Sequence, residues 1–490
     1  MRDAGLLAGL VLLHVLVVLA GAALLLALGA VERKPRPLVA AAGPAFFFGV
    51  ALLGPPLILL LVLGVEVGGP AMLAVAVGAA LVLGIVAVVR GDTWRALEAG
   101  PPAPRNEVLL SRVVLGLIAA YLLFALTGLI NLSTSFDDAN IWSLRGLGIY
   151  FHGELSDGIF RNPHFSFVHL DYPILQPVLE AGFFHAIGGV DLRLWHAELW
   201  AVFTSGIWTV AWLLADRGGS RAWVIPVSVI ALTSIGFGNV TLGDADATMA
   251  IFLGCAALTL GLWIGGGLRR HALLGAVLLG AVVNVKNEGA VFAFAVLVAA
   301  AVATLGRRSP ARRRDLAAIA GVAAACALPW QVYVVGNDAA TRSTIGPWRL
   351  FSDPGYFIDR LDLLGRGLGQ VARRLVEAPS WGLIVPAFLV VALALARDGR
   401  HRPVAVFYLL AWLLAALGVA YSYWVTPIGD LAGFEERTGP RIVIGVALIA
   451  GVGLAQLLPG AFARASPPAP DGRAGAAASG SDTCSRAAAG

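Results

Sequence analysis

The sequence predicts an all-α fold, a polytopic bundle of transmembrane helices. Hydrophobic residues make up 58% of the 490 residues and charged residues only 13%, with a mean hydropathy of +0.82. A soluble protein carries about 25% charged residues. The apolar residues also gather into long runs, and a run of about 20 residues is long enough to cross a bilayer as a helix.

Charged residues, glycines and prolines divide the apolar sequence into about 13 spans. The run from residue 5 is followed by Glu32 and Lys34 and not by a convincing cleavage site, so we expect it to be a retained span. The expected spans are 5–30, 41–65, 70–89, 112–131, 195–215, 222–238, 247–266, 271–285, 289–306, 316–335, 381–396, 403–424 and 441–458.

Basic residues set the expected orientation, because loops rich in Lys and Arg stay in the cytoplasm. Most of the 35 Lys and Arg, but a minority of the 30 Asp and Glu, fall in the segments 32–37, 90–112, 216–221, 267–271, 307–315, 397–402 and 459–490. We therefore expect a multi-pass protein of the cell membrane, with an extracytoplasmic N-terminus and a cytoplasmic C-terminus.

Two segments on the extracytoplasmic side, 132–194 and 336–380, are far longer than ordinary connections, and long loops are commonly functional. The first contains short apolar stretches at 146–151 and 173–190. The second stretch is too polar and too interrupted by proline for a span, so we expect a helix lying along the membrane interface.

Several classes of function find no support in the sequence. It contains no Walker motif, no HExxH and no GxGxxG after a strand. Cys255, Cys326 and Cys484 are scattered and suggest neither a disulfide framework nor a metal cluster. The net charge of +5 reflects Arg in short loops, so it does not indicate binding to nucleic acid.

Charged residues at the outer ends of apolar runs are the candidate site. Asp137 and Asp138 follow the span that ends near Asn131. A carboxylate there can accept a proton from a hydroxyl substrate, and two adjacent carboxylates can hold a divalent cation. The alternative is a solvated helix cap. Asp171 and Tyr172 lie later in the same loop, where Tyr172 is equally consistent with an aromatic anchor at the interface.

Two further pairs interrupt apolar sequence on the same side. Asp244 and Asp246 can converge on one ligand if they lie in a loop; the alternative is a tight turn with an N-cap Asp. Lys286 and Glu288 must lie at the tip of a hairpin within the apolar stretch 272–306. There Lys286 can pair with a phosphate or a carboxylate, or simply with Glu288.

Arg437 and Arg441 precede the last span, where outer-side arginines oppose the usual charge bias. A lipid phosphate can compensate them, and so can Glu435 and Glu436.

These motifs together resemble the GT-C class of polytopic glycosyltransferases, which includes protein O-mannosyltransferases and aminoarabinose transferases. The likeness covers residues 112–458. It consists of Phe136-Asp137-Asp138-Ala139, the Asp-Tyr-Pro-x-Leu-x-Pro segment at 171–177, Ala245-Asp246, Lys286-Asn287-Glu288-Gly289 and Arg437-Thr-Gly-Pro-Arg441. It divides the chain into a three-span accessory region (1–111), a catalytic membrane domain (112–458) and a disordered cytoplasmic tail (459–490).

The resemblance implies transfer of a sugar from a polyprenyl-phosphate donor to a hydroxyl of a lipid, glycan or protein acceptor on the extracytoplasmic face, with inversion. Asp137 or Asp138 is then the general base and Lys286, Arg437 and Arg441 face the donor phosphate. Asp244 and Asp246 shape the acceptor site or hold a divalent cation, which some relatives use. Asp171, Tyr172 and Glu288 complete the expected substrate site.

Two alternatives remain open from the sequence. A transporter or flippase of lipid-linked glycans also places charges inside a helical bundle, although it typically shows internal repeats with interrupted spans. A glycan polymerase or ligase differs from the expected transferase only in the size of its donor.

Overall fold

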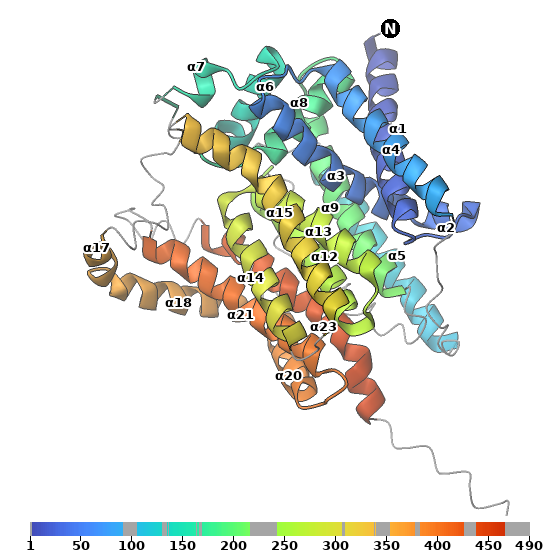
Figure 1. Ribbon diagram of the computed structural model, residues 1–490, viewed down its shortest axis with the longest axis vertical. Coiled ribbons are helices and arrows are strands. Elements are labelled where there is room, and N and C mark those ends of the chain that lie inside the picture. Colours follow the sequence, from blue (N-terminus) through green and yellow to red (C-terminus); the bar gives the residue numbers. More distant parts are fainter. Residues whose placement is uncertain are drawn as a thin grey trace, which may run out of the picture.

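The structure, a computed structural model, describes residues 2–91, 105–129, 135, 137–162, 164–165, 169–215, 243–305, 309–337, 339, 353–377, 383–425 and 438–465. All regular elements in these residues are helices (Figure 1). Their bounds are α1 Arg2–Ala27, α2 Pro35–Ala40, α3 Ala42–Val62, α4 Gly69–Arg90, α5 Arg105–Leu129, η1 Asp138–Trp142 (a π-helical turn), α6 Ser143–His152, α7 Asp157–Phe160, α8 Leu175–Ile187, α9 Leu192–Ala215, α12 Ala245–Gly266, α13 Arg269–Val285, α14 Asn287–Leu305, α15 Pro310–Gly336, α17 Pro354–Ile358, α18 Leu361–Val376, α20 Ile384–Ala396, α21 Arg402–Val425 and α23 Ile444–Ala465.

Within the described residues, 10 helices are long and apolar enough to cross a membrane, so the chain is a multi-pass integral membrane protein. Each of them coincides with an expected span. Two more expected spans form shorter helices: α13 with 17 residues and α20 with 13 residues. The expected span 222–238 lies outside the described residues.

Helix α12 occupies the centre of the bundle (Figure 1). Its most apolar stretch is 100% buried, and it contacts α9, α13, α14, α21 and α23. By contrast, only 11% of the corresponding stretch of α4 and 12% of that of α5 are buried. These outer helices expose large apolar side chains such as Val82 and Phe124, as expected for surfaces that face lipid.

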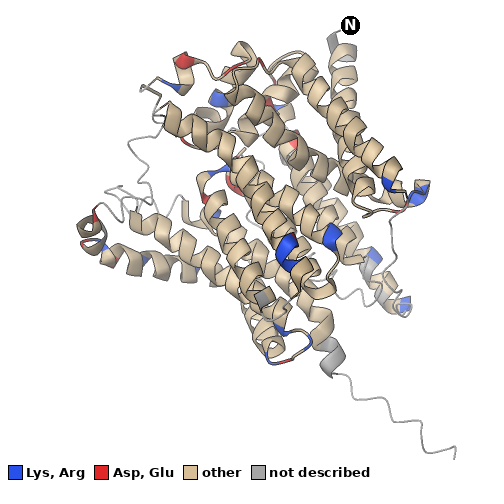
Figure 2. Cartoon of the chain, viewed as in Figure 1, with Lys and Arg blue, Asp and Glu red and all other residues tan. Residues whose placement is uncertain are grey.

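The expected cytoplasmic loops meet at one end of the helices. Arg270 at the start of α13 donates a hydrogen bond to the carbonyl of Gly29, 3.1 Å away. Arg90 at the end of α4 donates to the carbonyl of Ala27, and Arg269 lies 3.3 Å from Asp315 near the start of α15. Figure 2 shows basic segments gathered at α2, α5 and the lower ends of α13 and α15, and a mixed group at the upper end of α14.

The long segment between α5 and α9 folds into η1 and the short helices α6, α7 and α8. The sequence predicts that its apolar stretch at 173–190 lies along the interface, but α8 is almost entirely buried and contacts α1, α3 and α6. Its residues are apolar on most sides, so it packs inside the bundle. In the second long segment, α18 buries Gly367, Val371 and Leu375 and contacts α21.

Candidate functional site

Arg441 is the centre of a charged cluster at the end of the bundle opposite the basic loops. It lies in the helical turn before α23, and its Nη2 donates a hydrogen bond of 2.6 Å to Asp137. Its Nη1 lies 3.1 Å from Asp244 and its Nε lies 4.0 Å from Asp246. One guanidinium therefore joins three carboxylates from two distant segments, which its planar array of five N–H donors permits.

Lys286 extends the cluster between α13 and α14. Its Nζ lies 2.9 Å from Asp246 and 3.4 Å from Glu288, and 5.8 Å from the centre of the Tyr172 ring. Burial opposes the charge on Lys286, but Asp246 and Glu288 outweigh burial and raise its pKa well above the usual value. Lys286 is therefore a permanent cation. The charged cluster comprises Asp137, Asp244, Asp246, Lys286, Glu288 and Arg441.

The adjacent Asp137 and Asp138 point to different partners because both have helical backbone, which separates neighbouring side chains around the axis. Asp137 is 30% exposed and faces Arg441. Asp138 is fully buried; its Oδ2 lies 2.8 Å from Nε2 of His196 and its Oδ1 accepts a bond from Ser143. The sequence suggested that these two carboxylates can share one cation. In the structure they face different partners and do not form such a site.

The Asp138 side chain is closely packed, with Gly243 on one side and Glu180 on the other. Gly243 has a φ of +80°, and a Cβ on it would lie 2.2 Å from Cγ of Asp138, so only glycine fits there. On the other side, burial and then the negative charge of Asp138 raise the pKa of Glu180 on α8 well above the usual value. Burial of Glu180 therefore favours its neutral form, which limits the negative charge beside Asp138.

Asp244 and Asp246 converge because only Asp246 is helical. Asp244 is the extended N-cap residue of α12, whereas Asp246 lies in its first turn. Ser135 donates to Asp244 over 2.8 Å and also accepts the backbone N–H of Asp138, which links the two halves of the site. Burial raises the pKa of Asp244 to about 6, despite the opposing effect of Arg441.

The turn at 169–172 forms one wall of the site. His169 has a φ of +51°, a rare conformation for a residue with a side chain. Arg145, fully buried on α6, holds this turn by donating to the carbonyls of Tyr172 and, over 3.5 Å, His169. Tyr172 stacks between His169 and Trp142, with centroid distances of 4.6 and 5.8 Å.

Asp171 anchors this turn to the helical core. Its Oδ2 accepts a 2.7 Å bond from Asn287, the residue after Lys286, and its carbonyl accepts a bond from Trp330 on α15. A strained turn held by several buried bonds is typical of a functional site. The same turn places the Tyr172 ring over the Lys286 ammonium, 5.8 Å from the ring centre.

The structure joins every expected site residue that it describes: Asp137, Asp138, Asp171, Tyr172, Asp244, Asp246, Lys286, Glu288 and Arg441. Arg437 lies outside the described residues. The sequence analysis missed His196, Ser135, Ser143 and Arg145. A single histidine in an apolar span was a signal for His196, because ionisable residues inside membrane spans are usually functional.

Within the described residues, no group of three or more His, Cys, Asp or Glu is arranged to hold a metal ion. The carboxylates suggested as cation ligands, Asp244 and Asp246, face Arg441 and Lys286 instead.

No family model matches the chain, and no curated protein or solved structure is significantly similar to it.

Proposed function

We propose that this protein is an integral-membrane glycosyltransferase. It moves a sugar from a polyprenyl-phosphate donor to an acceptor hydroxyl. The observation that supports the proposal most is the charged cluster, in which a partly exposed carboxylate, Asp137, and two cations, Lys286 and Arg441, come together from three separate segments. A base and a phosphate-binding cation side by side are what such a transfer requires.

Asp137 is the general base in this proposal. It is 30% exposed, whereas Asp138 is fully buried and both of its oxygens are occupied by His196 and Ser143. A base must reach the proton that it removes, and only Asp137 has an open side. Asp138 is a positioning residue, because its backbone N–H and side chain fix the turn that presents Asp137.

Arg441 couples donor binding to the base. Asp137 accepts a 2.6 Å hydrogen bond from the Nη2 of Arg441. A donor phosphate that binds Arg441 displaces Asp137, and a carboxylate freed from an arginine is a stronger base. The acceptor oxygen then bonds to the anomeric carbon while the bond from that carbon to the phosphate oxygen breaks. The hydroxyl proton goes to Asp137, and Arg441 and Lys286 stabilise the negative charge on the released polyprenyl phosphate.

We place the site on the extracytoplasmic face of the cell membrane, because it lies opposite the loops that hold Arg90, Arg269 and Arg270. Nucleotide sugars are absent there, so a lipid-borne donor is consistent with this side. The same residues support the resemblance to GT-C glycosyltransferases.

Transfer can be tested with purified protein in proteoliposomes supplied with a panel of radiolabelled polyprenyl-phosphate sugars and membrane extract as the source of acceptor. We expect one donor to lose its label to a product only when the protein is present. We expect Asp137→Asn to slow this transfer by about 10²–10⁴-fold. Asp157→Asn is the matched control, because Asp157 on α7 is 74% exposed and its ion pair with Arg161 lies outside the charged cluster.

Transport is the outcome that contradicts the proposal. In that case no donor is consumed, and labelled lipid instead moves from one leaflet to the other at a rate that depends on the protein. Equal donor consumption by Asp137→Asn and Asp157→Asn would contradict the assignment of the base while leaving the transferase itself in place.

A further inference from the structure

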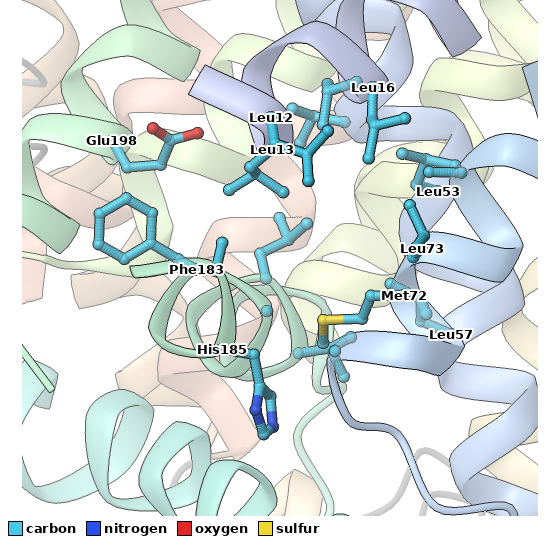
Figure 3. Close-up of a pocket in the computed structure, with 18 of the residues that line it drawn as sticks. Leu12, Leu13, Leu16, Leu53, Leu57, Met72, Leu73, Phe183, His185 and Glu198 are labelled. Carbon is cyan, nitrogen blue, oxygen red and sulfur yellow. The ribbon is translucent and has the colours of Figure 1, made fainter. Parts of the chain in front are cut away.

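An apolar cavity lies among the N-terminal helices and α8 and α9, away from the charged cluster. Its volume is about 280 Å³. It is lined by leucines of α1 and α3, by Met72 of α4 and, opposite Met72, by Phe183 of α8 (Figure 3). Ligand cavities begin at about 300 Å³, so this space suits part of an elongated molecule.

The cavity opens toward lipid. Leu12 on α1 and Leu73 on α4 both line it, yet they are 53% and 45% exposed. Both helices are long enough to span a membrane. Leaving an apolar cavity of this size empty destabilises a protein, and hydrocarbon from the bilayer is the material at its mouth.

The charged residue in the lining is already balanced. Glu198 on α9 lies at the edge of the cavity (Figure 3). The Nε2 of His14 on α1 lies 3.0 Å from its carboxylate. The His14 ring also stacks on Phe46, with centroids 5.4 Å apart. Because Glu198 has this partner, the cavity does not require a cationic ligand.

Helices α8 and α9 separate the cavity from the site. On α9, His196 faces Asp138 while Trp195 and Glu198 line the cavity. On α8, Gln176 donates to the carbonyl of Gly243 next to the site, while Phe183 lines the cavity. The two spaces therefore lie on opposite sides of a shared wall.

We infer that the cavity binds one acyl chain of a bilayer phospholipid. Bound there, the chain supports α8 and α9 from behind and so fixes the position of His196 against Asp138. A donor whose phosphate is held by Arg441 cannot place its chain in this cavity without crossing the shared wall, which favours a separate lipid. The inference does not depend on sugar transfer.

The test uses two photoreactive lipids in vesicles, a phosphatidylglycerol with a diazirine midway along one acyl chain and a polyprenyl phosphate with a diazirine in its chain. After illumination, labelled peptides are mapped by mass spectrometry. We expect the phosphatidylglycerol probe to label α8 around Phe183, and excess unlabelled phosphatidylglycerol to suppress that labelling. The lipid-facing Val82, which is 62% exposed, serves as the reference. Its labelling should fall only as far as the unlabelled lipid dilutes the probe in the bilayer.

A cavity-filling variant and a matched control sharpen the test. Ala76→Phe adds a ring at a position on α4 that lines the cavity and is 5% exposed. Val82→Phe adds a ring on the lipid-facing side of the same helix. We expect α8 labelling to fall several-fold in Ala76→Phe and to stay unchanged in Val82→Phe.

Two results would overturn the inference. One concerns the phosphatidylglycerol probe in the unmodified protein: excess unlabelled lipid reduces the labelling of α8 no more than it reduces the labelling of Val82. The other is labelling of α8 by the polyprenyl phosphate probe alone, which would identify the occupant as a substrate tail. Both readouts use the unmodified protein, so poor folding of Ala76→Phe would not obscure them.

Discussion

Arg441 and Asp137 are 304 positions apart in the chain, yet a 2.6 Å hydrogen bond joins them. The bond connects the turn before the last span to the start of the first long loop. It also brings the proposed base and the proposed phosphate ligand into direct contact. In the proposed mechanism, a donor phosphate therefore competes with Asp137 for the same guanidinium.

Substitution of the two neighbouring aspartates should have different effects. Asp137→Asn removes a base on the open side of the site, so we expect kcat to fall by about 10²–10⁴-fold with little change in melting temperature. Asp138→Ala leaves His196 and Ser143 without their partner, and we expect a loss of stability of about 1–3 kcal/mol. Transfer assays and thermal unfolding in detergent measure the two effects. The opposite pattern, a stable but inactive Asp138→Ala with an active Asp137→Asn, would exchange the two roles.

Lys286 and Asp246 should be energetically coupled, because both are buried and lie 2.9 Å apart. Lys286→Met leaves Asp246 without this partner, and breaking a buried pair costs about 3–5 kcal/mol. The double variant Lys286→Met/Asp246→Asn should be more stable than the sum of the single variants predicts, by about 1–3 kcal/mol. Chemical unfolding of the four proteins gives the coupling energy. Simple additivity would show that the pair contributes nothing specific.

Donor binding should depend on pH through Asp244. Burial raises the pKa of this carboxyl to about 6, so it becomes neutral as the pH falls through that value. The neutral form repels phosphate less, and bound phosphate in turn raises the pKa further. We expect the KM for donor to fall about tenfold across this transition, since removing one nearby like charge is worth on the order of 1–2 kcal/mol. In Asp244→Asn the KM should be low throughout; a pH step that persists in this variant would assign the titration to another group.

Gly243 and Gly267 offer a matched comparison, because both have positive φ, +80° and +73°. Alanine at either position costs about 1–2 kcal/mol of backbone strain. A Cβ at Gly243 also collides with Asp138, whereas at Gly267 the nearest atom is a side-chain nitrogen of Arg312 at 3.3 Å. Gly243→Ala should therefore lose both stability and transfer, and Gly267→Ala only stability. Equal transfer rates in the two variants would show that transfer does not depend on where the Asp138 side chain is held.

The sequence by itself determined the class of fold and most of the helices. Apolar runs of sufficient length must become helices in a bilayer, because every backbone polar group has to be paired within its own segment. The sequence also identified the candidate site residues, because a charged residue within or beside an apolar span is costly and therefore uncommon. It also indicated the hairpin tip at Lys286, where α13 ends and α14 begins.

Only the tertiary structure decided how those residues pair. No periodicity predicts that Asp137 faces Arg441 while Asp138 faces His196, because such contacts depend on how helices far apart in the chain pack. The burial of α8 likewise could not be predicted from the sequence, because an apolar helix covered by other helices and one lying on lipid have similar compositions. The apolar cavity behind α8 and α9 has no sequence signal either, because it is a property of the space between helices and not of any one of them.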